Sequence, residues 1–132
     1  MTSKNGQPPT TVGAYGEEVA VRYLRRAGYR IRHRNWKAGH YELDIVAVGD
    51  GHTVIVEVKT RRLTEEFADR FGTPASAVTP EKQRRIMGAA AQYRVRNRLR
   101  LPLRFDIIEV YLDPQSEAPV ACDLCHIRDA FR

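Results

Sequence analysis

The sequence contains no long run of apolar residues and no recognisable export signal. None of its apolar stretches approaches the roughly 18 residues that a membrane-spanning helix needs. Residues 1–10 are rich in Ser, Asn, Gly, Gln and Pro instead. These absences predict a cytoplasmic protein without a membrane partner, in which residues 1–10 form a disordered lead-in. Residues 11–132 have the length of a single domain.

Cysteine is also scarce, and its arrangement does not favour a cofactor. The only two cysteines are Cys122 and Cys125, followed by His126. This spacing is typical of c-type haem attachment, which requires export. A structural zinc needs four ligands, and no second Cys or His pair complements this one. We therefore interpret Val120 to Ile127 as a strand that carries two buried thiols.

Two long stretches of the sequence lack acidic residues. Seven Lys or Arg lie between Arg22 and Lys37 and eight between Lys82 and Arg104, in a chain of net charge +6. A basic domain indicates an acidic partner, either nucleic acid or an anionic membrane surface, although a soluble protein can simply be basic. The candidates for nucleic-acid binding are Arg32, Arg34, Lys37, Arg61, Lys82, Arg84 and Arg85.

Hydrophobic periodicity predicts two helices and five strands. Apolar residues at helical spacing indicate a helix from Val12 to Ala27, capped by Gly28. A second helix begins after Thr79 as N-cap and continues to about Asn97. The predicted strands are Tyr29–Trp36, Glu42–Val48, Thr53–Thr60, Leu103–Leu112 and Val120–Ile127, with an irregular segment at residues 61–78. The order α-β-β-β-α-β-β predicts an α/β fold: a mixed five-stranded sheet flanked by helices.

The second and third strands are predicted to form a hairpin with Asp50-Gly51 as its loop. In this register Gly49 opposes His52, Asp44 opposes Glu57 and Glu42 opposes Lys59. Alternation places Glu42 and Asp44 on one face, with Leu43, Ile45 and Ala47 on the other. Opposed side chains share a face with Cβ atoms about 5 Å apart, so the register brings two acids together beside a lysine.

Facing carboxylates are unfavourable in a hairpin unless water or a cation screens them. Two carboxylates at this separation can share one Mg²⁺ or Mn²⁺, because both ions prefer hard oxygen ligands. Lys59 is then placed to hold an attacking water or to offset charge on a phosphoryl group. The alternative is an exposed hairpin face of mixed charge. Three aromatic residues could stack on bases or belong to the core: Tyr29, Trp36 and Tyr41.

Several short stretches together resemble the YraN-like family of endonuclease-like proteins, which are similar to Holliday junction resolvases. The stretches lie between about Gly13 and Phe131: Gly16-Glu17, Asn35-Trp36, Glu42 to Ala47, Val56 to Lys59, Lys82-Gln83 and Arg104 to Asp106. The resemblance implies the restriction-endonuclease-like core of the PD-(D/E)XK nucleases. Leu43 stands where the motif's name has proline, and Tyr41 stands where the family pattern has glycine.

The resemblance also implies roles for individual residues. Asp44 matches the first metal-binding aspartate, and Glu57 and Lys59 match the acid and lysine of the second half-motif. The Val58 carbonyl is expected as a further metal ligand, and Glu17 matches the helix-borne glutamate of resolvase-like sites. Glu42 and Gln83 are candidates for accessory roles.

The expected function is that of a metal-dependent endonuclease using Mg²⁺ or Mn²⁺. The resemblance favours DNA over RNA, branched or otherwise structured substrates, and a homodimer. The alternative is a catalytically silent nucleic-acid-binding module of the same fold that acts as an accessory protein in DNA processing, because a fold does not by itself establish activity.

Overall fold

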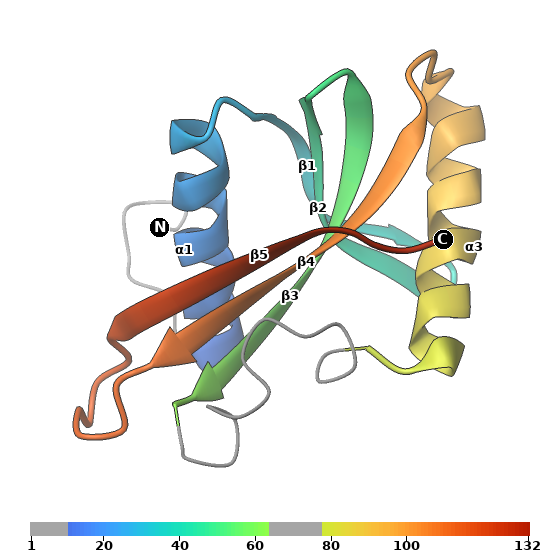
Figure 1. Ribbon diagram of the computed structural model, residues 1–132. Helices are drawn as coiled ribbons and strands as arrows, with labels where there is room; N and C mark the ends of the chain where they lie inside the picture. Colours follow the sequence, from blue (N-terminus) through green and yellow to red (C-terminus); the bar gives the residue numbers. More distant parts are fainter. Residues whose placement is uncertain (1–10, 64–77) are drawn as a thin grey trace.

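The computed structural model describes residues 11–63 and 78–132, in which two helices flank a five-stranded sheet (Figure 1). The elements follow the predicted order: α1 (Val12–Arg26), β1 (Arg30–Ala38), β2 (Tyr41–Gly49), β3 (His52–Arg62), α3 (Pro80–Asn97), β4 (Leu103–Leu112) and β5 (Ala121–Phe131). The predicted lead-in at residues 1–10 and most of the predicted irregular segment, residues 64–77, lie outside the described residues.

The strands lie side by side in sequence order, β1-β2-β3-β4-β5, and the sheet is mixed as predicted. Neighbouring strands are antiparallel except β3 and β4, which run parallel. A parallel pair requires a crossover connection, and α3 belongs to this crossover. The two helices lie on opposite sides of the sheet, so we call its two surfaces the α1 face and the α3 face (Figure 1).

The hairpin between β2 and β3 has the predicted loop. Asp50 and Gly51 both adopt positive φ, 52° and 74°, as a two-residue turn of type I′ requires. The ladder runs from Gly49↔His52 to Ile45↔Val56 in the predicted register. The register is therefore confirmed for these five pairs.

The two predicted caps, Gly28 after α1 and Thr79 before α3, are confirmed, and Thr11 is a further N-cap that the sequence analysis did not name. The Thr11 side chain accepts a hydrogen bond from the Ala14 N–H, and the Thr79 side chain accepts one from the Lys82 N–H. Gly28 follows α1 with a φ of 96° and donates its N–H to the Arg25 carbonyl. Neither helix in the described part of the chain is long and apolar enough to cross a membrane.

Each face of the sheet has its own hydrophobic core. The core on the α1 face contains Ala20, Val21, Leu24, Tyr29, Ile45, Ala47, Val54, Val56, Ile108, Val110 and Leu112. The core on the α3 face contains Leu43, Val46, Ile55, Val78, Ile86, Ala89, Ala90, Tyr93, Ile107 and Phe131. Burial on both faces explains why β2, β3 and β4 are nearly continuous apolar runs in the sequence.

Strict alternation along β2 is the first expectation that the structure corrects. Leu43 was expected to share a face with Ile45 and Ala47, but it packs in the α3-face core while they pack in the α1-face core. Val46 also lies in the α3-face core, so residues 43 and 46 share a face although they are three apart. Regular pleating is therefore interrupted between them, at Asp44.

The predicted pair of buried thiols is the second correction. Cys122 is exposed and Cys125 is half-buried, and both are free. The reason is that β5 is an edge strand and is only partly covered. His126 is the buried member of the motif: its side chain is 3% exposed, with Nε2 2.7 Å from Asp106 and Nδ1 2.8 Å from the Tyr23 hydroxyl.

Candidate metal centre

The site lies where β2 and β3 separate. Their ladder ends at Ile45↔Val56, and the next position in the predicted register, Asp44 opposite Glu57, is not a ladder pair. The Asp44 carboxylate instead accepts a hydrogen bond from the Val58 N–H at 2.9 Å. The predicted pair Glu42 and Lys59 is likewise absent from the ladder. The Asp44 side chain thus takes the place of the backbone group of β2 that would have bonded the Val58 N–H in a continued ladder.

The same arrangement directs the backbone carbonyl of Val58 toward the gap between β2 and β3. The N–H and C=O of one residue in a strand point toward the same neighbouring strand. Because the Val58 N–H reaches Asp44, the Val58 carbonyl also points toward the gap beside Asp44. The carbonyl expected from the resemblance therefore has the direction that a metal ligand at this place needs.

Glu57 is the most buried acid of the site. It is 6% exposed and lies within hydrogen-bonding reach of the Asp44 carboxyl. Two ammonium groups approach the same oxygen, Oε2: Lys59 Nζ at 3.8 Å and Lys82 Nζ at 3.6 Å. Burial, and then repulsion from Asp44, raises the pKa of Glu57 to about 7, although both lysines oppose this shift. The two lysines therefore do not offset burial and the repulsion from Asp44, and the pKa of Glu57 stays above its ordinary value.

Glu17 brings a third carboxyl to the same place from α1. Burial raises its pKa to about 7, and the Asp44 charge contributes in the same direction. A hydrogen bond from Asn35 and the charge of Arg34 oppose the shift, whereas Glu42 adds a weaker repulsion. The structure thus brings together acids from α1, β2 and β3, and we call Glu17, Asp44 and Glu57 the acid cluster.

The donors of the acid cluster fit a hard divalent cation. Carboxylate and carbonyl oxygens are the ligands that Mg²⁺ and Mn²⁺ prefer. Among the described residues, no three Asp, Glu, His or Cys side chains lie close enough to complete a metal site by themselves. A divalent cation here would therefore have to be held by two carboxylates, as is common for Mg²⁺, which keeps several waters.

Two of the seven residues predicted to bind nucleic acid lie directly beside the acid cluster. Arg34 reaches it from the α1 face, where its guanidinium lies 2.9 Å from Glu18. Lys82 reaches it from the first turn of α3. Cations therefore lie on both sides of the acid cluster.

The other predicted cations are more scattered. Lys37, Arg84 and Arg85 are exposed, and Arg85 pairs with Glu81 at 2.9 Å. Arg32 is exposed and hydrogen-bonds the Tyr93 hydroxyl, so it belongs to the α3 face and not to the side of Arg34. Arg61 is half-buried and near Tyr111.

Gln83 and the three aromatic candidates have mainly structural contacts. Gln83 Nε2 donates to the Val78 carbonyl at 3.2 Å. Tyr29 is buried in the α1-face core, which is the second of the two alternatives given for it. Trp36 is half-buried against Tyr93, with ring centroids 5.1 Å apart. Tyr41 remains 37% exposed.

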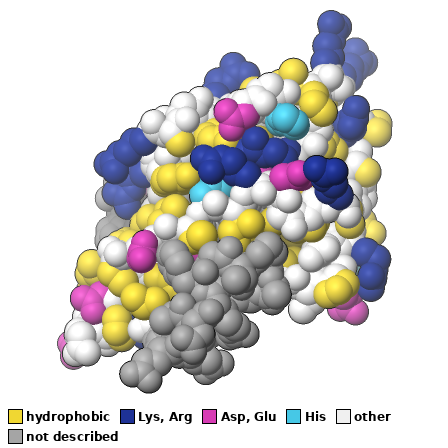
Figure 2. Space-filling model, viewed as in Figure 1, with side chains coloured by type: hydrophobic (Ala, Val, Ile, Leu, Met, Phe, Trp, Pro, Cys, Tyr) yellow, Lys and Arg dark blue, Asp and Glu magenta, His cyan; other side chains and the backbone are white. Residues whose placement is uncertain are grey.

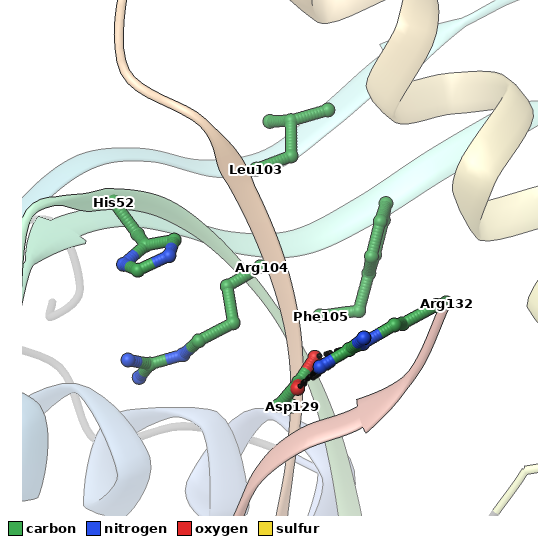
Figure 3. A pocket seen from close by; sticks show the side chains of 6 residues that line it. All are labelled: His52, Leu103, Arg104, Phe105, Asp129 and Arg132. Carbon is green, nitrogen blue, oxygen red and sulfur yellow. Dashed lines mark hydrogen bonds and ion pairs between the residues drawn. The ribbon is translucent and has the colours of Figure 1, made fainter.

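A separate recess of about 520 Å³ lies at the opposite end of the same strands. Figure 3 shows its six lining residues, among them Arg104 and Arg132. Arg132 pairs with Asp129 at 2.6 Å, and Arg104 pairs with the buried Asp106 at 2.7 Å. Figure 2, in the same view as Figure 1, shows Lys and Arg side chains interspersed with acids and histidines. The recess shares no lining residue with the acid cluster, and its two arginines are paired with acids. We therefore assign it no part in the site.

Asn35 is a site residue that analysis of charge and register did not identify. It has a positive φ of 51° in the middle of β1, and its side chain bonds Glu17. A neutral amide does not appear in an analysis of charge, and strand alternation does not predict a residue with positive φ. The only signal in the sequence was the stretch Asn35-Trp36 in the family resemblance.

Comparison with known proteins decides the family. The model of "Uncharacterised protein family UPF0102" matches residues 16–110. The chain belongs to the UPF0102 family. This is the YraN-like family that the motifs resemble, and the matched range contains the whole acid cluster together with Lys59 and Lys82.

Relatives of this UPF0102 chain occur in distant bacteria. A UPF0102 protein of Bacteroides fragilis is 52% identical over 99 residues, which cover 75% of this chain and 78% of the relative. A UPF0102 protein of Rhodococcus opacus is 40% identical over 121 residues, 91% of this chain and 95% of the relative. One from Clostridium perfringens is 36% identical over 123 residues, 92% and 94%. The similarity thus covers 78% of the Bacteroides relative and nearly the full length of the other two.

Proposed function

We propose that this UPF0102 protein is a cytoplasmic endodeoxyribonuclease that depends on Mg²⁺ or Mn²⁺ and acts on branched or otherwise structured DNA. The observation that carries the proposal is the meeting of Asp44 and Glu57 where β2 and β3 separate. Facing carboxylates are costly without a cation. A fold that retains them beside lysines is suited to bind a metal ion and a phosphate together.

In this proposal Asp44, Glu57 and the Val58 carbonyl hold the metal ion. The ion supplies Lewis-acid polarisation of the phosphate and lowers the pKa of water. Lys59 lies 3.8 Å from Glu57 and offsets the negative charge that develops on the phosphoryl oxygens. Glu17, with its pKa near 7, is suited to take up a proton from the attacking water at neutral pH.

The cations on either side of the acid cluster bind the phosphate backbone in this proposal. Arg34 and Lys82 are nearest, while Lys37, Arg84 and Arg85 extend the contact surface. Contacts to phosphates fix the position of a duplex without reading its sequence. We therefore expect recognition of DNA shape and charge, with weak dependence on base sequence.

The proposal is tested by a cleavage screen over four-way junctions, nicked duplexes and single strands with Mg²⁺, Mn²⁺ or EDTA. Wild type is expected to cut at least one structured substrate only with metal. Lys59→Ala should lower the single-turnover rate by about a hundredfold or more while DNA is still bound. Salt-dependent binding without metal-dependent cleavage of any substrate would replace the proposal with the accessory binding module.

A further inference from the structure

Asn35 occupies an irregular position in β1. On one side of it, Arg34 points to the α1 face and pairs with Glu18 at 2.9 Å. On the other side, Trp36 packs with the α3-face core. Asn35 itself has a φ of 51°, in the left-handed region. Among residues with a Cβ atom, asparagine is one of the few that adopt this conformation readily.

The irregular position coincides with the break in β2. The pairs Arg34↔Ile45 and Trp36↔Leu43 enclose Asn35 and Asp44, which places them level with each other on neighbouring strands. Alternation in β2 is interrupted at Asp44 in the same way. The two strands therefore depart from regular pleating together, beside the acid cluster.

Two adjacent contacts join this part of β1 to α1. Arg34 pairs with Glu18, and the Asn35 side chain donates a hydrogen bond to the Glu17 carboxylate. Glu18 thus forms an ion pair with Arg34, whereas Glu17 is hydrogen-bonded by a neutral amide and is affected by the Arg34 charge without an ion pair. A cation at position 35 would neutralise Glu17 and compete with a metal ion, but an amide can fix the orientation of the carboxylate and leave its negative charge available.

We propose that Asn35 is a positioning residue of the metal centre, whose left-handed backbone aims its amide at Glu17 and thereby holds the Glu17 carboxylate toward Asp44. The inference rests on the proposed function, since it gives Glu17 a task at the metal. It predicts that Asn35 acts only through Glu17 and has no contact with the metal or with DNA.

The test uses Asn35→Gly, because glycine adopts positive φ without strain and removes only the amide. Mn²⁺ affinity is measured by calorimetry for wild type, Asn35→Gly, Glu17→Gln and the double variant. Loss of a hydrogen-bonding group in the shell around the metal ligands typically weakens metal affinity at least tenfold. We expect about a tenfold loss in each single variant and no further loss in the double variant. Unchanged affinity in Asn35→Gly, or losses that multiply in the double variant, would overturn the proposal.

A second readout does not depend on metal. In the metal-free protein, the side-chain amide resonances of Asn35 should shift on Glu17→Gln and remain in place on Glu18→Gln, whose acid contacts Arg34 instead. The reverse pattern, or no shift in either variant, also overturns the assignment. If wild type takes up no Mn²⁺ while the amide responds to Glu17 alone, the proposed function fails but the contact stands as a structural one.

Discussion

The Glu57 carboxyl brings together most of the chemistry that is visible at the level of single residues. It is nearly buried, faces Asp44 and is approached by two lysines at one oxygen. A metal ion at this carboxylate must compete with both ammonium groups. Lys82 is the more exposed of the two, with 44% of its side chain accessible, so it is the one that can most easily turn away toward a phosphate.

This competition predicts that Lys82→Ala increases metal affinity while it weakens DNA binding. A partly exposed ion pair contributes up to about 1 kcal/mol, which corresponds to roughly a twofold to fivefold tighter binding of Mn²⁺. Calorimetry with Mn²⁺ and a fluorescence titration with DNA measure the two effects. Arg85→Ala is the matched control for metal affinity on the same helix, because Arg85 pairs with Glu81 and not with the acid cluster; its Mn²⁺ affinity should equal that of wild type. Weaker metal binding in Lys82→Ala would contradict this account.

Between elements, the contact that positions the acid cluster is the packing of α1 on β3. A Cβ atom at Gly16 would lie 1.8 Å from Thr60 Oγ1, whereas one at Gly13 would meet no atom within 4 Å. Glycine at position 16 therefore lets the helix approach the strand closely enough for the neighbouring Glu17 to reach Asp44.

Gly16→Ala is expected to move α1 away from β3. Overpacking of this kind typically costs about 1–3 kcal/mol, and the displaced Glu17 should also weaken Mn²⁺ binding. Gly13→Ala provides the control: it adds a better helix former in open space and should raise stability by up to about 1 kcal/mol. Chemical denaturation and calorimetry measure both quantities. Equal stability of the two variants would show that the close approach is unimportant.

The elements themselves were largely predictable from the sequence, because their signals are local. Asp50-Gly51 specified the turn and hence the ladder register, and the caps at Thr79 and Gly28 specified helix ends. The prediction of a facing pair at Asp44 and Glu57 was right about proximity but wrong about its form. The prediction assumed that regular strand pairing continues along the whole hairpin. In the structure the ladder ends at Ile45 and Val56, and the Asp44 side chain bonds the Val58 N–H instead.

The features that could not be predicted depend on contacts between distant segments. The left-handed Asn35 is stabilised by contact with α1, and the reversal of Leu43 depends on packing against the α3 face. Burial of His126 rather than of the two cysteines likewise depends on Asp106 and Tyr23, which lie far away in the sequence. Strand periodicity carries no information about such partners.

For the whole molecule, the acid cluster makes the stability of the metal-free protein depend on pH. Glu17 and Glu57 have pKa values raised from 4.5 to about 7, so between these values the folded state binds more protons than the unfolded state. Stability should therefore fall as pH rises from about 4.5 to 7. The opposite effect of Asp106, whose pKa is lowered to about 2, lies below this window.

Thermal melts in EDTA from pH 4.5 to 8 measure this dependence. Glu57→Gln should flatten the decline relative to wild type, because one of the two proton-binding groups is removed. Added Mg²⁺ should stabilise wild type more at pH 8 than at pH 5, since metal ligands must be deprotonated. A wild-type profile that rises steadily through this range would contradict the raised pKa values.

The basic surface predicts salt-dependent binding of DNA by the whole molecule. Each neutralised phosphate contributes about −0.9 to the slope of log affinity against log salt on duplex DNA. Charge reversal at Arg84 and Arg85 on α3 should weaken binding and make the slope less steep. The control reverses Arg25 and Arg26, two exposed residues at the far end of α1, which changes net charge equally. Equal losses in both double variants would indicate a nonspecific effect of net charge.

The central claim, that Asp44 and Glu57 form a site for a divalent cation, is tested most directly by calorimetric titration of the pure protein with Mn²⁺. Wild type and the control Asp123→Asn, which changes an exposed acid of β5, are expected to bind one Mn²⁺ with the same affinity. Asp44→Asn should remain folded and lose this binding, because it removes the negative charge of one of the two neighbouring carboxyl groups with little change in side-chain volume. Equal Mn²⁺ binding by Asp44→Asn and wild type would contradict the account.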